Sequence, residues 1–572
     1  MTERPVLSRA MLLAFAFFVA TRIAAIPAST WEFDEPLFIL TGKLVSLVAP
    51  SEFSTLIAIS FCASLLGFVL LAMAFRNIGG DERIGIAGAL LFYFSPGMLL
   101  HSTMPISDPG ALCLLAATLF FSSFLTRDDS RRSTELAFAA FAALTVGWRP
   151  QFSIVILPLF FTTLALLRTW RARFVAVATF TVVCILWLIP LVVSVGGVRE
   201  LIDFETGQAQ YLAAQDADES RGNWSAPQIA ARFIAHPWGT KVLAAPILVL
   251  ALVGLWWLAT KRTRAFLPIA VAGLVYLTFA LAVMDPADGV RYALPFTLVA
   301  ALLAAAGAIY VTERTHHAIP SYALVAAFAL GAMAYVSLGI VERRTTTAPP
   351  MRAVAYARAT FPPNAVVLYD QALWPHARHF LTRFHPQRID KGLAAYVDRA
   401  DVPLFILADG HSNLPGTRTF TWTAHDAYSK LTRNHYRVVS VSPLPPQKRF
   451  AIVSGVYAPE RLPEGEEWRW LAGRAEIRLP NREARAVRLR LGLPVLYPYP
   501  DNKLTISVDG APARTLHLQK ATSHEIVLPV TRPGAVVRFE AAREFVPMHL
   551  PNTLFRDPRR LAVKLYDVET QP

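Results

Sequence analysis

With 572 residues, 54% of them hydrophobic and only 17% charged, the chain is too apolar for a soluble enzyme. Its net charge of +14 would suit a nucleic-acid-binding protein, but the basic residues lie mostly in short clusters between apolar runs, where they act as topology signals. The composition therefore indicates a polytopic membrane protein with a soluble part, and it argues against nucleic acid as a partner.

Apolar runs long enough to cross a membrane recur along the first 345 residues. A bilayer-spanning helix needs about 20 mostly apolar residues. The runs predict about eleven spans, at roughly 10–28, 54–75, 84–100, 109–125, 135–147, 150–167, 174–196, 241–260, 266–284, 293–312 and 321–341. Residues 1–28 have the basic start and apolar core of a signal peptide, but Arg22 interrupts the core and many spans follow. We therefore expect an uncleaved first helix.

The basic residues between the spans predict the orientation. With the N-terminus inside, the inner segments contain fourteen: Arg4, Arg9, Arg76, Arg83, Arg127, Arg131, Arg132, Arg168, Arg171, Arg173, Lys261, Arg262, Arg264 and Arg314. The outer loops contain six over much more sequence: Lys43, Arg149, Arg199, Arg221, Arg232 and Arg291. Because basic loops stay on the cytoplasmic side, we expect a cytoplasmic N-terminus and a periplasmic C-terminal part.

Hydropathy drops after about residue 345, and the pattern changes. Short apolar runs ("AVVLYD", "VPLFILADG", "HYRVVSVSPL") between helical stretches such as "MRAVAYARATF" predict a small α/β domain over 346–460. Alternating runs such as "AVRLRLGL", "LTISVDG" and "HEIVLPV" between turns predict an antiparallel β-sandwich over 461–572. Together with a transmembrane domain over 1–345, this gives three domains. The soluble part contains no cysteine, because Cys62, Cys113 and Cys184 all lie in apolar runs.

Adjacent acids follow the first span, in "TWEFDEPLF". Asp34 and Glu35 precede Pro36, which fits the first turn of a helix, where carboxylates are favoured. Arg22 lies a few residues before the membrane surface, where a cation either snorkels to the interface or marks a partner or ligand. The two acids are therefore candidates either for a helix cap or for a functional site.

A further acid, Asp108 in "HSTMPISDPG", also precedes a proline and could be the N-cap of the fourth helix. His101 in the same motif is typical of an interfacial or hydrogen-bonded histidine. A metal site built from His101, Asp108 and Glu35 is an alternative, although no Cys/His spacing of a metal-binding motif is present.

Two arginines lie at the outer ends of later spans, Arg149 in "GWRPQ" and Arg291 in "VRYALP". Each could be a headgroup anchor, with Trp148 and Tyr292 as part of an aromatic belt. Together, on the side that carries the acids, they suggest recognition of an anionic headgroup, because the forked donors of arginine suit phosphate.

The order and sidedness of these motifs resemble those of the C-type (GT-C) membrane glycosyltransferases, which include the protein O-mannosyltransferases and the aminoarabinose transferases of lipid A. The resembling features are a first helix with an arginine, an outer loop with Asp-Glu, a second outer Asp after the third span, and an Arg-Tyr-x-x-Pro near a late outer boundary. The resemblance covers residues 1–345. The C-terminal sandwich is not a feature that those groups generally share.

The resemblance implies a sugar donor carried on a polyprenyl phosphate, undecaprenyl phosphate in particular, and used on the outer face of a bacterial inner membrane. Asp34 would then be the general base of an inverting transfer, with Glu35 and Asp108 as further catalytic residues. The residues at the donor phosphate would be Arg22, Arg149, Arg291 and Tyr292. The acceptor would be a glycolipid, a polysaccharide or a protein. No cofactor is required, although a divalent metal is possible.

Two other functions compete with this interpretation. A transporter or flippase usually has charges in mid-span and two related halves, whereas these polar motifs gather at outer boundaries and no half-repeat is detectable. A non-catalytic scaffold that presents the sandwich as a glycan-binding module would leave the acids and arginines without a role.

The predicted sandwich has a basic, aromatic end. The aromatic side chains that could stack on sugar rings are Tyr497, Tyr499, Phe545 and Phe555, and Arg559 and Arg560 could meet anionic groups. The same residues could instead fill the core or dock on the membrane surface. We expect this domain to position the acceptor or a loop, with no catalytic residue beyond 345.

Overall fold

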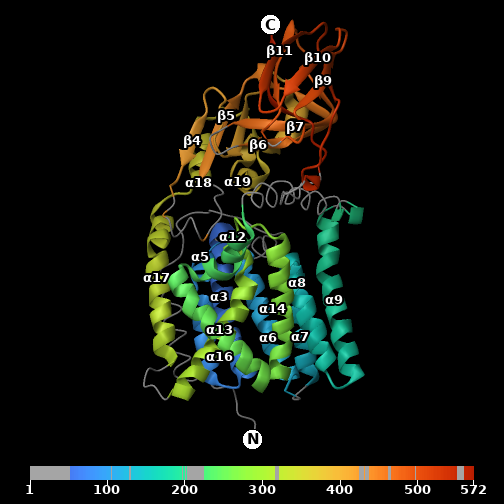
Figure 1. Ribbon diagram of the computed structural model, residues 1–572. Coiled ribbons are helices and arrows are strands. Elements are labelled where there is room, and N and C mark those ends of the chain that lie inside the picture. The colour runs from blue at the N-terminus through green and yellow to red at the C-terminus, as the bar shows by residue number, and fades with distance from the viewer. Residues whose placement is uncertain are drawn as a thin grey trace. The chain divides into compact units, whose positions relative to one another are not determined.

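The computed structural model describes residues 52–102, 104, 106–127, 131–195, 197–199, 201–202, 224–315, 321–423, 425, 431, 437–461, 466–495, 497–550 and 559–572. The described residues up to Thr346 form one compact unit, and most of those from Thr347 onward form another. Figure 1 labels the elements of both units.

Among the described residues of the first unit, the regular elements are helices joined by turns and short connections. Its longer helices are α3 (Glu52–Gly79), α4 (Glu82–Tyr93), α6 (Asp108–Leu125), α7 (Arg132–Trp148), α8 (Ser153–Leu166), α9 (Trp170–Val195), α13 (Lys241–Lys261), α14 (Thr263–Val283), α16 (Leu294–Thr315) and α17 (Ser321–Thr345). The shorter segments are α5 (Pro96–His101), η1 (Pro150–Phe152), α12 (Ala226–Ala230), η3 (Ala231–Ala235), η4 (His236–Trp238) and α15 (Gly289–Tyr292).

The predicted spans can be compared with these helices. Seven of the described helices are long and apolar enough to cross a membrane, so the fold is that of a polytopic membrane protein, and a count of eleven is not confirmed. The first predicted span, 10–28, lies outside the described residues. The third, 84–100, is divided between α4 and α5 at Phe94 and Ser95. Ser95 is the N-cap of α5, and Pro96 after it has no N–H with which to continue the preceding helix.

Close helix packing in this unit relies on small residues. A Cβ atom at Gly254 of α13 would lie 1.8 Å from the carbonyl oxygen of Leu303 in α16, and one at Gly307 of α16 would lie 2.0 Å from that of Leu250 in α13. Helices in membranes approach each other closely at such positions. In Figure 1, α9 lies at the rim of the unit, where it packs against α7.

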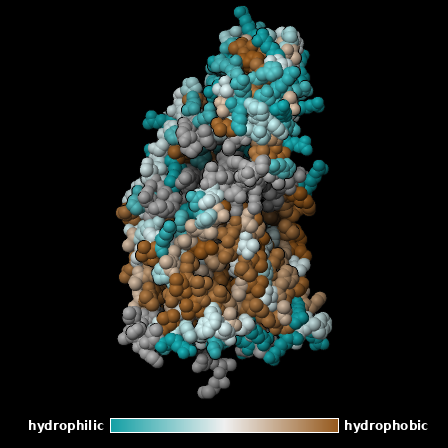
Figure 2. Space-filling model, viewed as in Figure 1, coloured by the Kyte–Doolittle hydropathy of each residue, from teal (hydrophilic) through white to brown (hydrophobic). Residues whose placement is uncertain are grey.

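The surface of the helical unit is strongly apolar. In Figure 2 a broad hydrophobic band crosses the face of this unit that is in view. Side chains such as Phe174 and Leu186 of α9 and Leu252 of α13 are 65%, 66% and 68% exposed. Soluble monomers rarely expose contiguous apolar surface of this kind, whereas lipid would cover it.

The second unit contains a five-stranded sheet with the strand order β2-β1-β3-β5-β4. The strands are β1 (Val366–Tyr369), β2 (Gln387–Arg388), β3 (Leu404–Asp409), β4 (Arg418–Thr421) and β5 (Val438–Leu444), and the helical segments are α18 (Pro349–Thr360), η5 (Gln371–Leu373), α19 (Trp374–Phe380), η6 (Thr382–Phe384), α20 (Ile389–Tyr396) and η7 (Pro446–Lys448). Strand β1 pairs in parallel with β2 and β3, and β5 pairs antiparallel with β3 and β4. Three runs expected to be strands form β1, β3 and β5.

The remaining strands form an eight-stranded antiparallel sheet. They are β6 (Ala451–Arg461), β7 (Glu467–Arg478), β8 (Ala486–Gly492), β9 (Asp501–Val508), β10 (Arg514–Gln519), β11 (Ser523–Pro529), β12 (Val536–Ala541) and β13 (Val563–Gln571), with η8 (Pro547–His549) before β13. The strand order is β10-β9-β12-β7-β13-β8-β11, and β6 pairs with β7. Since β6 belongs to this sheet, the sheet begins at residue 451, before the expected boundary at 461.

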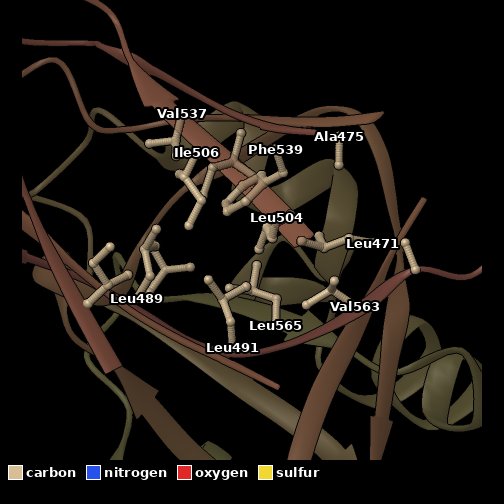
Figure 3. Packing of buried hydrophobic residues seen from close by; sticks show 14 of the residues in the cluster. Leu471, Ala475, Leu489, Leu491, Leu504, Ile506, Val537, Phe539, Val563 and Leu565 are labelled. Atoms are coloured by element: carbon tan, nitrogen blue, oxygen red, sulfur yellow. The ribbon is translucent and has the colours of Figure 1, made fainter. Parts of the chain in front are cut away.

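Strand β7 is shared by the two halves of this sheet. Its residues Arg474–Arg478 pair with β12, while Arg469–Leu471 pair with β13. In Figure 3, Leu489 and Leu491 of β8 lie across the core from Ile506 of β9. The expected sandwich is therefore a single sheet whose two halves enclose one apolar core.

Candidate functional site

Asp108 is the first residue of α6, and it is only 2% exposed. The N-cap position of this helix is taken by Ser107, and no side-chain capping bond forms there. The N-cap residue of α6 is therefore Ser107 and not Asp108, whose carboxylate binds side chains from other elements.

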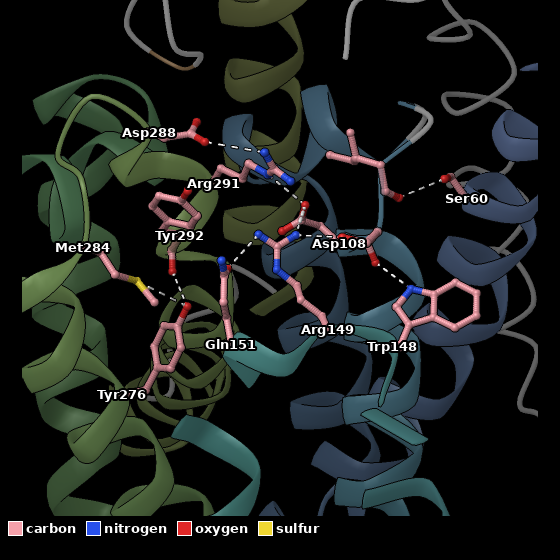
Figure 4. A network of polar contacts seen from close by, with 12 residues as sticks. Ser60, Asp108, Trp148, Arg149, Gln151, Tyr276, Met284, Asp288, Arg291 and Tyr292 are labelled. Atoms are coloured by element: carbon pink, nitrogen blue, oxygen red, sulfur yellow. Dashed lines mark hydrogen bonds and ion pairs between the residues drawn. The ribbon is translucent and has the colours of Figure 1, made fainter. Parts of the chain in front are cut away.

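Two arginines from distant parts of the chain share one oxygen of Asp108. The Nη1 of Arg149 donates to Asp108 Oδ2 at 2.6 Å, and the Nε of Arg291 donates to the same oxygen at 2.8 Å (Figure 4). Arg149 lies between α7 and η1, and Arg291 lies in α15. The side chains of Asp108 and Arg149 are each 3% exposed, and that of Arg291 is 11% exposed. The contact is therefore a buried ion cluster.

Arg149 is oriented by groups on both sides of its guanidinium. Its Nη1 also donates to Ser107 Oγ at 2.9 Å, and its Nη2 donates to Gln151 Oε1 at 3.2 Å. The neighbouring Trp148 donates from Nε1 to the carbonyl oxygen of Ser107 at 2.9 Å. These bonds tie the end of α7 to the start of α6. A role for Arg149 as an exposed headgroup anchor does not fit this burial.

Arg291 is held by its own segment. Its Nη1 lies 3.6 Å from Asp288 Oδ2, an ion pair between residues three apart. The hydroxyl of Tyr276 in α14 donates to the carbonyl oxygen of Tyr292 at 2.7 Å, which fixes α15 against α14 (Figure 4). The main-chain carbonyl of Tyr292 therefore helps to hold the segment that carries Arg291.

The connection that leads to Asp108 is anchored by serines of α3. Ser64 Oγ donates to the carbonyl oxygen of Ser102 at 3.0 Å, and Ser60 Oγ donates to that of Ile106 at 3.3 Å. The four residues that make these bonds are all buried: Ser60, Ser64, Ser102 and Ile106. Hydroxyls thus satisfy the main chain where α5 has ended and α6 has not begun.

His101 has a structural bond of its own. It is 1% exposed, and its Nδ1 lies 2.7 Å from the carbonyl oxygen of Gly97, one helical turn earlier. Glu35, the third ligand of the considered metal site, lies outside the described residues. Within the described part of the chain, no group of three or more His, Cys, Asp or Glu side chains could hold a metal ion.

The predicted site residues therefore divide into three sets. Arg22, Asp34 and Glu35 lie outside the described residues. Asp108, Arg149 and Arg291 come into direct contact, as described above, whereas His101 and Tyr292 contribute the separate bonds already given. Three further residues of the site were not predicted from the sequence, Ser107, Gln151 and Asp288, although Asp288 lies in the same stretch, "DPADGVRYALP", as Arg291.

The arrangement of Asp108 and its two arginines indicates what kind of ligand the cluster could bind. A guanidinium carries five N–H donors in one plane, so an arginine anchored through one edge can direct the other edge at a phosphate. One carboxylate that binds two guanidinium groups also fixes the distance between them. The arrangement suits an anion with several oxygens better than a lone proton transfer.

The aromatic end expected in the C-terminal domain is largely part of its core. Tyr497 is fully buried and Phe545 is 9% exposed, and the two rings pack edge to face with their centroids 5.3 Å apart. Tyr499 is 37% exposed, and Phe555 lies outside the described residues. Arg559 donates to Glu460 Oε1 at 2.8 Å. The described rings therefore do not form the exposed platform considered above.

Comparisons with known proteins give structural matches only: no family model and no curated protein matches this sequence. ArnT from Cupriavidus metallidurans, bound to undecaprenyl phosphate, aligns with a TM-score of 0.46 and 12% identity, over 75% of this chain and 97% of that chain. The oligosaccharyltransferase AglB from Archaeoglobus fulgidus, in complex with an inhibitory peptide and a dolichol-phosphate, aligns with a TM-score of 0.40 and 9% identity, over 93% and 91%.

The arabinofuranosyltransferase AftD from Mycobacteria is also similar, with a TM-score of 0.42 and 11% identity, over 99% of this chain and 62% of that chain. These structures come from the group that the sequence motifs resemble, the C-type membrane glycosyltransferases. All three TM-scores are below 0.5, so the likeness is distant, and the proposed function rests on this chain's own residues.

Proposed function

We propose that this protein is a membrane glycosyltransferase that transfers a sugar from a polyprenyl phosphate to an acceptor hydroxyl. The observation that carries the proposal is the buried contact of Arg149 and Arg291 with Asp108, the first residue of an apolar helix long enough to cross a membrane. Ionisable groups inside a membrane unit are costly, and they usually mark a functional site.

Arg149 and Arg291 are proposed to bind the donor phosphate, together with Arg22. Charge builds up on the phosphate as it leaves the sugar, and guanidinium groups already in place stabilise that charge without reorganisation. Undecaprenyl or a similar polyprenol is proposed as the lipid because of the resemblance in the sequence motifs. The resemblance implies a catalytic role for Asp108; we propose instead that it holds the two guanidinium groups at a fixed separation and does not react itself.

The proposed reaction is an inverting displacement. The acceptor hydroxyl attacks the anomeric carbon from the face opposite the phosphate, and the bond from that carbon to the phosphate oxygen breaks. Asp34 accepts the hydroxyl proton as general base, and Glu35 orients the acceptor. The products are the glycosylated acceptor and the polyprenyl phosphate. Positioned general bases typically contribute about 10²–10⁴-fold to such a rate.

The proposed location is the outer face of a bacterial inner membrane, with a cytoplasmic N-terminus and a periplasmic C-terminal unit. This follows from the excess of basic residues in the inner segments. Asp108 begins α6, Arg149 follows α7, and Arg291 lies in the short α15 between α14 and α16, which distinguishes them from the mid-span charges that transporters usually carry. A glycosyltransferase is therefore favoured over a flippase.

The test separates donor binding from transfer. Purified protein in detergent is titrated with undecaprenyl phosphate, and the sugar and acceptor are identified by mass spectrometry of lipids and glycans from a strain that lacks the gene. Arg291→Ala should weaken undecaprenyl phosphate binding, because the arginine meets a charge that is present before the reaction. Asp34→Asn should bind normally, but transfer should fall by about 10²–10⁴-fold.

Arg171→Ala is the matched control, since Arg171 is an exposed arginine at the start of α9, outside the cluster. It should leave binding and transfer unchanged. If Asp34→Asn reached normal membrane levels and restored every glycan of the deletion strain, the protein would be a scaffold or transporter instead.

A further inference from the structure

The turn between α14 and α15 determines where Arg291 lies. Asp285 Oδ1 accepts from the main-chain N–H of Ala287 at 2.8 Å, which closes the turn. Asp288, at the end of the turn, is the residue that pairs with Arg291. Asp285 and Asp288 are only 4% and 7% exposed. The turn therefore positions Asp288, the partner of Arg291.

Another arginine, Arg232, is buried and binds main-chain carbonyls of this turn. Its Nε donates to the carbonyl oxygen of Pro286 at 2.9 Å, and its Nη2 donates to that of Ala287 at 2.6 Å. Arg232 is 5% exposed. Packing is tight as well, because a Cβ atom at Gly289 would lie 3.1 Å from Cβ of Arg232. One side chain thus joins two segments that are more than fifty residues apart in the sequence.

The segment that carries Arg232 holds the side chain in place. Arg232 lies in η3, a π-helical turn between α12 and η4, and such turns often occur at functional sites. Its Nη1 lies 3.2 Å from His236 Nδ1, which accepts because a guanidinium only donates. The ring centroid of Trp224 lies 5.5 Å from the guanidinium carbon. All three nitrogens of the guanidinium are therefore bound.

The charges around Arg232 link it to the same cluster. Burial lowers the pKa of Arg232, and the carboxylates of Asp288 and Asp285 oppose that shift. Asp288 therefore pairs with Arg291, and its charge also acts on Arg232. The resulting order of contacts is Arg232, the 285–288 turn, Arg291, Asp108 and Arg149.

We propose that Arg232 is a positioning residue for Arg291. By binding the carbonyls of Pro286 and Ala287, it fixes the turn that holds Asp288 against Arg291, and thereby sets the direction in which that guanidinium faces the donor phosphate. The inference deepens the proposed function and rests on it. It also gives the 224–240 segment a role in donor binding, through contacts with the protein alone.

Arginine is required at this position for a geometric reason. The two carbonyl oxygens and the His236 nitrogen are met by three different nitrogens of one rigid, planar group. A lysine has one ammonium group on a flexible stem, so it can replace the charge and one or two of these bonds but cannot fix their mutual angle. Glutamine replaces neither the charge nor the full set of bonds.

The test measures undecaprenyl phosphate binding to the full-length protein in detergent. Arg232→Gln should raise the dissociation constant about tenfold, and Asp288→Asn should do the same. The double variant should be no worse than either single one, because both changes break the same link. Arg232→Lys should be intermediate, which a general loss of folding would not produce.

Arg173→Gln is a matched control. Arg173 also donates to main-chain carbonyls, those of Ala165 and Leu167 at the end of α8, but it lies outside the cluster. Its removal should leave the dissociation constant unchanged. If Arg232→Gln does not fold, Arg232→Lys alone and combined with Asp288→Asn provides the same comparison.

The outcomes separate the two proposals. If wild-type protein does not bind undecaprenyl phosphate, or if Arg291→Gln binds it as well as wild type does, the proposed function fails and the role of Arg232 fails with it. If Arg291→Gln weakens binding but Arg232→Gln and Arg232→Lys do not, the proposed function stands and the positioning role is wrong. Additive losses from Arg232 and Asp288 variants would also overturn it.

Discussion

Both units contain an aspartate that binds two arginines, but the two clusters differ in their surroundings. In the helical unit, the side chains of Asp108 and its partners are between 3% and 11% exposed. In the C-terminal unit, Asp509 pairs with Arg532 and Arg538, whose side chains are 64% and 45% exposed. Asp509 also accepts from the main-chain N–H of Val536 at 3.1 Å. The residue types are the same, but the two arginines share one oxygen of Asp108 and bind different oxygens of Asp509, and water reaches only the arginines of the second cluster freely.

This difference decides what each cluster can do. Taking charges out of water costs several kcal/mol per ion, so a buried ion cluster rarely persists for stability alone. Exposed pairs contribute about 0–1 kcal/mol and are screened by salt. The cluster at Asp108 is thus the better candidate for a function, whereas the one at Asp509 fastens the end of β9 to the start of β12.

The largest effect is expected for Asp108→Asn. The change leaves two buried guanidinium groups without their shared carboxylate, which should lower the free energy of unfolding by about 3–5 kcal/mol. Transfer should fall by about 100-fold or more, because both proposed phosphate-binding residues lose their common anchor. Scanning fluorimetry and a transfer assay measure the two effects. If Asp108→Asn were as mild as Asp509→Asn, the contrast between the clusters would be wrong.

A smaller effect is expected for Arg149→Lys, which keeps the positive charge but removes the forked pair of terminal nitrogens. Lysine cannot reproduce the geometry of the hydrogen bonds that the two terminal nitrogens of Arg149 make with Asp108, Ser107 and Gln151. Undecaprenyl phosphate binding should weaken about tenfold, or about 1.4 kcal/mol, with little loss of thermal stability. Arg532→Lys serves as control and should change neither quantity. A loss of stability larger than the loss of binding would make Arg149 a structural residue.

The sequence predicted the helices well, because apolar runs of sufficient length leave few other structures in a membrane. It also placed Asp108, Arg149 and Arg291 as polar residues at span ends on one side. It could not show that the three share one oxygen atom. Arg232 was counted only as an outer basic residue, because bonds to main-chain carbonyls leave no pattern of residue types.

The C-terminal unit shows a second limit. Strand β6 was not expected, since it contains a glycine and a proline, and its pairing with β7 shifts register between Ile452 and Ser454 and again further along. Tyr497 and Phe545 were considered for a sugar-binding surface because aromatic, basic segments suit one. Their burial depends on packing between β-strands and loops that are distant in the sequence.

A modest, pH-dependent effect is expected for Asp509→Asn. Hydrogen bonds from Arg532 and Arg538 lower the pKa of Asp509 from its ordinary value of 3.8 to about 2. Because the folded state holds the proton less tightly, the carboxylate stabilises the fold above pH 3.8, and this contribution is lost as the pH falls toward 2. At neutral pH the variant should lose about 1 kcal/mol or less.

The measurement is the melting temperature of full-length wild type and Asp509→Asn from neutral pH down to the lowest pH at which both stay folded. The difference should narrow steadily below about pH 4. Transfer activity at neutral pH should be unchanged. If the difference in melting temperature stayed constant across this range, the charge of Asp509 would not explain it. The cause would then be the poorer fit of the asparagine amide in place of the carboxylate.

The smallest effect is expected for Arg532→Gln. With 64% of its side chain exposed, Arg532 keeps most of its hydration when it pairs with Asp509, and Arg538 and the Val536 N–H still bind the carboxylate after the change. The free energy of unfolding should fall by less than about 0.5 kcal/mol. At a salt concentration of about 1 M, where charges are screened within about 3 Å, this difference in the free energy of unfolding should disappear. The equivalent change at Arg149 should depend much less on salt, because buried pairs are screened much less than exposed ones. Equal salt dependence at the two positions would mean that solvent reaches Asp108 as freely as it reaches Asp509.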